Sequence, residues 1–73
     1  MAEDVETEVT GKVWKLVAKP GDTLSEDDPI LILESMKMEI PVCAPFDGTV
    51  AEICVGEGDA VDEGDVMARM DED

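Results

Sequence analysis

The sequence predicts an all-β fold in which two similar halves enclose one core. Short segments rich in Val, Ile and Leu are separated by turn signals made of Gly, Pro and Asp. The large apolar residues are mostly aliphatic, and Trp14 and Phe46 are the only aromatic residues. The second half of the chain also repeats the pattern of the first. Because 73 residues leave too little interior for two cores, we expect a single domain over residues 1–73.

The first half carries the signals for three strands. Residues 1–8 are acidic and are expected either to form an edge strand or to fray. In residues 11–18, apolar residues are interleaved with lysines, and this strand ends at a Pro-Gly-Asp turn signal in residues 20–22. An aliphatic run of strand length then follows in residues 30–34.

The middle of the chain predicts a hairpin. Residues 38–44 alternate between apolar and other residue types, and only residues 35–37 separate them from the preceding strand. Pro41 has no N–H group to donate, so it must face away from a central ladder position. A Pro-Phe-Asp-Gly turn signal follows in residues 45–48.

The second half follows the same plan as the first. Residues 49–55 favour a strand, and residues 66–70 form the last apolar run. Between them, Val61 stands alone between two turn signals that contain Gly and Asp. The acidic tail, residues 71–73, is expected to be a solvated end of the chain.

The two halves are an internal duplication with a spacing of 37 residues and no gap. The repeats span about residues 9–36 and 46–73. Neither half could bury an apolar face alone, so we expect both to enclose a shared core about a pseudo-two-fold axis. Identical pairs at this spacing are Gly11 and Gly48, Val13 and Val50, Gly21 and Gly58, Asp22 and Asp59, Glu26 and Glu63, and Asp28 and Asp65.

The duplication isolates the segment around Lys37. Position 34 corresponds to Asp71, so the first copy runs on through residues 35–38, whereas the second copy has reached the last residues of the sequence. We therefore expect Lys37 on an exposed hairpin at the end of the sandwich opposite the chain termini.

Charge and composition exclude several classes of function. The chain has 20 acidic and 5 basic residues, a net charge of −15, which repels nucleic acids and anionic membrane surfaces. It has no His, so neither a His-based catalytic triad nor a His-containing metal site can form. The longest apolar run, residues 30–33, is too short to span a bilayer. We expect a soluble, cytoplasmic protein with no catalytic residues and no metal site.

Several other residues have a structural interpretation beside a functional one. Cys43 and Cys54 are interpreted as free thiols without a catalytic role, because nothing in the sequence signals export to an oxidising compartment. Trp14 is interpreted as a half-buried packing residue on a sheet face rather than as a partner contact. The acidic clusters are interpreted as solvated surface rather than as calcium sites.

The segment around Lys37 displays one cation between two thioethers. It belongs to a set of four motifs, namely Glu34-Ser35-Met36-Lys37-Met38, Gly21-Asp22, Ala44-Pro45-x-x-Gly48-x-Val50 and Gly58-Asp59-x-Val61-x-x-Gly64-Asp65. In these motifs the chain resembles the biotinyl domains of biotin-dependent carboxylases and, more distantly, lipoyl domains, over about residues 9–70. Lipoyl domains usually carry Asp before and Ala after the target lysine, so Met36 and Met38 favour biotin. Among biotinyl domains, the chain is most similar to short stand-alone biotin/lipoyl attachment proteins.

The resemblance implies a flattened barrel-sandwich hybrid of two four-stranded antiparallel sheets, with the target lysine on an exposed hairpin. It also implies that a biotin protein ligase attaches biotin to Lys37. The resulting carrier takes a carboxyl group from a biotin carboxylase to a carboxyltransferase that acts on an acyl-CoA or a 2-oxoacid. The chain would then be a non-catalytic carrier subunit, and isolated domains of this family are usually monomeric.

Attachment requires a neutral amine, and a free lysine amine is mostly protonated at neutral pH, so the ligase must supply desolvation or a base. Two points stay open. Met36 and Met38 either contact the ligase or biotin, or fill irregular gaps in the packing. Glu34 either guides ligase recognition or solvates a strand end. The alternative functions are a lipoyl carrier of a 2-oxoacid dehydrogenase-type complex and an unmodified interaction module.

Overall fold

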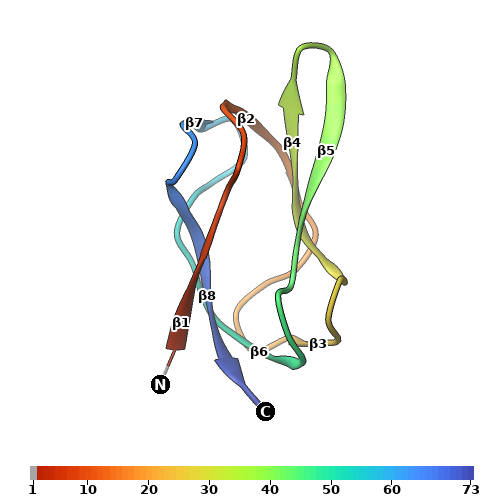
Figure 1. Cartoon of the computed structure of the whole chain (residues 1–73), viewed down its shortest axis with the longest axis vertical. Helices are drawn as coiled ribbons and strands as arrows, with labels where there is room; N and C mark the ends of the chain where they lie inside the picture. Colours follow the sequence, from red (N-terminus) through yellow and green to blue (C-terminus); the bar gives the residue numbers. More distant parts are fainter. Residues whose placement is uncertain (1) are drawn as a thin grey trace.

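Every element in the described part of the chain is a β-strand (Figure 1). The structure is a computed structural model that describes residues 2–73. The all-β prediction is confirmed, and no helix long and apolar enough to cross a membrane occurs among these residues. The strands are β1 (Ala2–Glu6), β2 (Gly11–Leu16), β3 (Thr23–Leu24), β4 (Pro29–Ser35), β5 (Met38–Cys43), β6 (Gly48–Ile53), β7 (Ala60–Val61) and β8 (Val66–Glu72).

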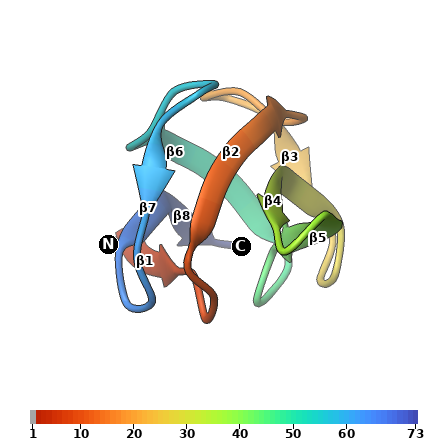
Figure 2. The same cartoon turned by 90° about the horizontal axis from the view of Figure 1, so that it is seen from above.

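The strands form two four-stranded antiparallel sheets that face each other (Figure 2). One sheet has the order β1-β8-β6-β3, and the other has the order β5-β4-β2-β7. Apart from β4 and β5, which form a hairpin within one sheet, strands that follow one another along the chain lie in different sheets, so the chain crosses repeatedly between the two layers. This confirms the sandwich of two four-stranded sheets that the family resemblance implies.

The two sheets are equivalent under the 37-residue repeat. Adding 37 to the residue numbers carries β2 onto β6, β3 onto β7 and β4 onto β8 with identical bounds. The same shift carries β1 onto β5, so the order of one sheet becomes the order of the other. Val5 and Val42, which this shift pairs, are both buried. The equivalence therefore reaches further toward the amino terminus than the range 9–36 expected from the sequence.

Hydrogen bonds join the halves at equivalent places. The N–H of Gly58 donates to the carbonyl of Val13, and the N–H of Gly21 donates to the carbonyl of Val50, both at 2.8 Å. In return, the N–H of each valine donates to the carbonyl of the residue after that glycine. Each valine immediately precedes a β-bulge, where the register of its ladder shifts. A turn of each half is thus held by the bulged strand of the other half.

The core is aliphatic, as the composition predicts. Residues that the duplication pairs, such as Ile30 with Met67 and Leu33 with Met70, are fully buried. Phe46 is partly buried and packs against this core. Because both sheets contribute their inner faces, neither half could exclude water from its apolar residues without the other. The largest fully buried side chains are Ile30, Leu31, Leu33, Met67, Met70, Val13 and Val50.

Four turns are closed by the same aspartate hydrogen bond. In each turn, the carboxylate of the fourth residue accepts a hydrogen bond from the N–H of the first residue, at 2.8 to 3.1 Å. The N–H of that aspartate donates back to the carbonyl of the first residue. Part of the acidic surface therefore consists of aspartates that close turns by hydrogen bonding to the backbone. The donor and acceptor pairs are Lys19 and Asp22, Ser25 and Asp28, Gly56 and Asp59, and Asp62 and Asp65.

Both ends of the chain are held in the sheet with order β1-β8-β6-β3. β1 forms an edge strand, which was one of the two expectations for residues 1–8. Of these residues, Met1 lies outside the part of the chain that the structure describes. Residues 71–73 are exposed, as expected for a solvated end, and Asp71 and Glu72 in addition extend β8. Asp71 pairs with Ala2 on one side and with Thr49 on the other. Two flanking strands supply ladder partners, so β8 continues although these side chains are polar and exposed.

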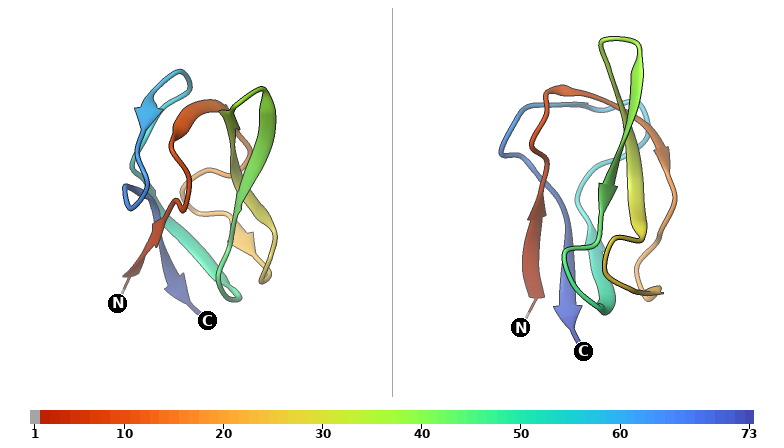
Figure 3. Two further views of the ribbon diagram at one scale, coloured as in Figure 1. Left: turned by 45° about the horizontal axis from the view of Figure 1, so that its top comes forward. Right: turned by 45° about the vertical axis from the view of Figure 1, so that its right-hand side comes forward.

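The Lys37 hairpin and the two termini lie at opposite ends of the molecule, as predicted (Figures 1 and 3). The molecule measures 34 × 17 × 17 Å along its principal axes. In Figure 1 and in the right view of Figure 3 the β4–β5 hairpin projects beyond the other strands, and β1 begins and β8 ends at the far end. The fold therefore leaves the hairpin tip open to solvent on several sides.

Candidate functional site

Lys37 lies at the tip of the hairpin formed by β4 and β5. Ser35 pairs with Met38, so the turn contains only Met36 and Lys37. Their φ angles are 52° and 65°, the two positive values of a type I′ turn, whose twist matches that of the flanking strands. Asn and Gly usually occupy such positions, because the left-handed region costs other residues about 1 kcal/mol or more each. The lysine is thus displayed on a tight, strained turn that the paired strands hold in place.

The side chains of the motif are open to solvent. Met36 is 92% exposed and Met38 is 63% exposed, and Glu34 and Lys37 are exposed as well. Neither thioether fills a gap in the packing, which favours the open alternative that they contact the ligase or biotin. Throughout the described residues, Lys37 takes part in no ion pair. Its amine is therefore accessible to an external enzyme.

The base of the hairpin is anchored to the loop between β1 and β2. The Ser35 hydroxyl donates a hydrogen bond to the Thr10 carbonyl at 2.8 Å, and the Thr10 hydroxyl accepts one from the N–H of Glu63 at 3.3 Å. A Cβ on Gly11 would lie 2.5 Å from the Glu34 carbonyl oxygen, so only glycine permits this close approach of β2 to β4. No role for Ser35 could be predicted from the sequence, because only the fold brings its hydroxyl to Thr10.

Glu34 lies on the outer face of the hairpin's sheet. It pairs in register with Lys12 of β2 and with Glu39 of β5. Its carboxylate makes no ion pair within residues 2–73. An exposed carboxylate three residues from Lys37 fits both open interpretations, ligase recognition and solvation of the strand end.

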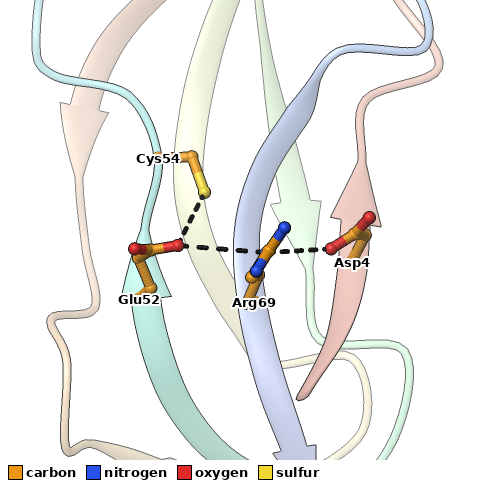
Figure 4. A network of polar contacts seen from close by, with 4 residues as sticks. All are labelled: Asp4, Glu52, Cys54 and Arg69. Carbon is orange, nitrogen blue, oxygen red and sulfur yellow. Dashed lines mark hydrogen bonds and ion pairs between the residues drawn. The ribbon is translucent and has the colours of Figure 1, made fainter. Parts of the chain in front are cut away.

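Both cysteines are free, and neither lies at the tip of the Lys37 hairpin, because Cys43 ends β5 and Cys54 follows β6. Cys54 lies beside a polar network on the outer face of the other sheet (Figure 4). Its thiol donates to Glu52 at 3.6 Å, and Arg69 Nε lies 3.0 Å from Asp4 and 3.9 Å from Glu52. Partial desolvation, followed by the hydrogen bond to the Glu52 carboxylate, raises the pKa of the Cys54 thiol. A raised pKa keeps the thiol protonated, which agrees with its interpretation as an unreactive residue.

Trp14 lies on the outer surface and not in the core. It is 49% exposed and is the extra residue of the β-bulge between Val13 and Lys15. This placement agrees with a half-buried residue on a sheet face, as the sequence predicts. It also leaves half of the indole surface open to a partner.

The hairpin presents a nucleophile at its exposed tip. Lys37 Nζ is one exposed primary amine, and such an amine can be joined by an amide bond to a cofactor that carries a carboxyl group. The two-residue turn fixes the origin of the side chain, and the four-carbon stem can extend into the pocket of another protein. This arrangement suits covalent attachment of a cofactor by an external enzyme.

Comparison with known families agrees with this geometry. A sequence model of the family described as "Biotin-requiring enzyme" matches residues 2–70. The chain belongs to this biotin-requiring family. The match confirms the predicted family and, with it, biotin as the cofactor. It also includes β1, which the motifs in the sequence had not reached.

Individual relatives match nearly the whole chain. It is 44% identical over 68 residues to the biotinylated protein TB7.3 homolog of Mycobacterium leprae, which covers 93% of this chain and 96% of the relative. It is 44% identical over 66 residues to the biotin/lipoyl attachment protein of Bacillus subtilis, covering 90% of both. The urea amidolyase of Saccharomyces cerevisiae is 43% identical over 70 residues, which are 96% of this chain but 4% of that protein.

Solved structures show the same fold inside larger proteins. The urea carboxylase of Kluyveromyces lactis matches with a TM-score of 0.91 and 40% identity, over 96% of this chain and 6% of that chain. A single-chain, multi-domain long-chain acyl-CoA carboxylase matches with a TM-score of 0.90 over 99% of this chain and 7% of that chain. At 21% identity, the second match supports the fold alone. This biotin-requiring domain therefore spans a small part of these carboxylases and nearly the full length of its short relatives.

Proposed function

We propose that this chain is a biotin carboxyl carrier and that Lys37 is its attachment residue. The observation that carries the proposal is the display of Lys37 at the exposed tip of a two-residue turn, at the end of the molecule opposite the termini. The motif Glu34-Ser35-Met36-Lys37-Met38 marks the same residue in the sequence. The biotin-requiring family supports biotin as the group attached there.

In this proposal the chain contributes by presenting the Lys37 amine to the ligase. The neutral Nζ of Lys37 attacks the activated carboxyl carbon of biotin held by a biotin protein ligase. The new C–N bond replaces the bond to the activating group, and a base of the ligase takes the amine proton. β4 and β5 fix the position of the amine, and the clamp between Ser35 and Thr10 holds the hairpin base. Biotin attached to Lys37 would supply a ring that can carry a carboxyl group.

The partners follow from this role. A tethered carrier raises the effective concentration of its cargo at each active site that it visits. The sites proposed here are those of a biotin carboxylase and of a carboxyltransferase, for an acyl-CoA or 2-oxoacid substrate. Relatives named pyruvate carboxylase, 34% identical over 64 residues in Staphylococcus aureus, support a carboxylase as the host assembly. The chain acts as a substrate of these enzymes and catalyses no reaction itself.

Intact-mass measurement of the protein from its native source tests this proposal. We expect one biotinyl increment in the wild-type protein and none in Lys37→Arg, with an unchanged thermal unfolding curve, because an exposed side chain contributes little packing energy. Lys19→Arg is the matched control, since it replaces another exposed lysine and should keep the increment. A lipoyl increment or an unmodified wild-type protein contradicts the function. Biotin on Lys37→Arg contradicts the assignment of the residue.

A further inference from the structure

The sheet that carries the Lys37 hairpin has an unusual outer face. Register places Lys15 of β2, Ile32 of β4 and Pro41 of β5 side by side, and places Lys12 beside Glu34. Their inward neighbours Val13, Leu31 and Leu33 are buried, so this set points outward. Trp14 and Val17 complete it, with exposed fractions of 49% and 46%. We name this surface the Trp14 face, defined by Lys12, Trp14, Lys15, Val17, Ile32 and Pro41.

The duplication supplies an internal comparison for this surface. Positions 37 residues later occupy the same places on the other sheet, and the residue equivalent to Pro41 is Asp4 of β1. There the bulge residue is Ala51 instead of Trp14, and Arg69 stands at the place of Ile32. The full set of equivalents is Thr49, Ala51, Glu52, Cys54, Arg69 and Asp4. Buried pairs such as Val13 with Val50 and Leu33 with Met70 stay apolar, whereas the exposed indole and the lysines are not repeated, so the fold does not require them.

Charge distinguishes the two faces further. The whole chain has a net charge of −15, yet three of its five cations lie in residues 12–19. The equivalent face pairs Arg69 with Asp4 and Glu52 (Figure 4). In contrast, Lys12 and Lys15 form no ion pair with any described residue. An exposed indole flanked by two ammonium groups without an ion-pair partner among the described residues fits a partner with an apolar pocket rimmed by carboxylates.

The shape of the surface is also suited to a docked side chain. A pocket of about 240 Å³ lies beside Trp14 and is also lined by Lys12, Glu34 and Gly58. Its position between β2, β4 and the turn before β7 joins the Trp14 face to the base of the hairpin. The hairpin and the Trp14 face therefore form one continuous surface.

The distance from Lys37 indicates which enzyme covers this surface. Glu34, level with Lys12, and Ile32, level with Lys15, are three and five residues before Lys37, or about 10 and 17 Å along a strand. A ligase must bring its active site to Lys37 Nζ itself, at the end of a short stem, so its surface has to lie against the hairpin and the adjoining face. An enzyme that acts on the ring of attached biotin works at the end of a longer arm and can remain further away.

We propose that the Trp14 face is the docking surface for the biotin protein ligase that modifies Lys37. This inference rests on the proposed function. The indole inserts into an apolar pocket of the ligase, and Lys12 and Lys15 face carboxylates at the rim of that pocket. The acidic face around Arg69 stays free in the complex.

Steady-state biotinylation by the purified ligase from the native source, with biotin and ATP, tests the proposal. We expect Trp14→Ala and Lys15→Glu each to raise KM for the carrier by about tenfold, the effect of a central interface residue. The value of kcat should stay within about twofold, because neither residue touches the reacting amine. The effect of Lys15→Glu should shrink as salt is added. Circular dichroism and thermal unfolding establish that both variants are folded.

Two control variants separate docking from general effects. Lys19→Glu makes the same change of charge in the turn of residues 19–22, outside the Trp14 face. Glu52→Ala truncates the residue equivalent to Lys15 on the other sheet. Both should label with the wild-type KM. If the wild-type protein is labelled but Trp14→Ala and Lys15→Glu keep KM within about twofold of wild type, the docking proposal is overturned while the Lys37 assignment stands. If the wild-type protein is not labelled at all, the proposed function itself fails.

Discussion

Gly11 and Gly48 provide a matched pair of substitutions at the two ends of the sandwich. They are equivalent in the repeat, and both lie against a backbone carbonyl of the neighbouring strand. A Cβ on Gly11 would meet the Glu34 carbonyl oxygen at 2.5 Å and Ser35 Cβ at 3.2 Å, at the hairpin base. A Cβ on Gly48 would meet the Asp71 carbonyl oxygen, near the carboxyl terminus. Alanine at either position must push two paired strands apart.

The cost of each substitution can be worked out from this geometry. Backbone atoms cannot rotate away as a flexible side chain can, so we take the middle of the range for overpacking, about 2 kcal/mol. With an unfolding entropy of about 2.1 cal/mol/K per residue, a 73-residue chain should then lose about 13 °C of melting temperature. Gly11→Ala and Gly48→Ala should therefore be destabilised to a similar extent.

Only the first substitution should affect labelling strongly. Gly11→Ala displaces Glu34 and Ser35 and so loosens the turn that positions the amine, and we expect labelling at 15 °C to slow by about three- to tenfold. Gly48→Ala should label at nearly the wild-type rate, because its strain lies at the opposite end. Urea unfolding gives the free energies, and timed labelling by the ligase gives the rates. Equal loss of labelling in both variants, or a stability loss under about 0.5 kcal/mol, would refute this reasoning.

Two further predictions concern local hydrogen bonding and backbone strain. Ser35→Ala removes the 2.8 Å bond to Thr10 and should lower the free energy of unfolding by about 1 kcal/mol, measured against Ser25→Ala in an exposed turn. An unchanged stability would mean that the clamp contributes nothing. Asp27, with φ 74°, occupies the place that Gly64 holds with φ 92° in the second half. Asp27→Gly should leave the stability unchanged or raise it by up to about 1 kcal/mol, whereas Gly64→Ala should lower it by about 1 kcal/mol. Urea unfolding measures both, and a change of the same sign in both variants contradicts this account.

The Lys37 hairpin could be predicted from the sequence, but the conformation of its turn could not. The apolar runs on either side of residues 35–37 predicted two strands, and three intervening residues predicted a short connection. These patterns did not show that Ser35 pairs with Met38, so that only two residues, both with positive φ, remain in the turn. Met-Lys has no propensity for such a turn. The pairing of β4 with β5 imposes it, and this pairing is a property of the whole sheet.

The turn aspartates can be recognised in the sequence, but their hydrogen bonds cannot. Asp22 with Asp59 and Asp28 with Asp65 are identical pairs in the repeat, and several of them lie in predicted turn signals, yet the sequence does not show what their carboxylates bind. Their carboxylates accept hydrogen bonds from the first N–H of their turns. An identity that recurs at a surface position of a duplication is a signal for such a backbone contact, because solvation alone does not require one residue type.

Residue type, spacing and repetition are local properties of the chain, and they were enough to predict the all-β class, the duplication and the singular position of Lys37. The three-dimensional structure was needed to show that β1 is the equivalent of β5, that Asp71 and Glu72 extend β8, and that Trp14 faces solvent beside the hairpin. These features depend on which strands become neighbours, and on bulges that set which face a side chain occupies. Such pairings join residues far apart in the chain, so no local pattern encodes them.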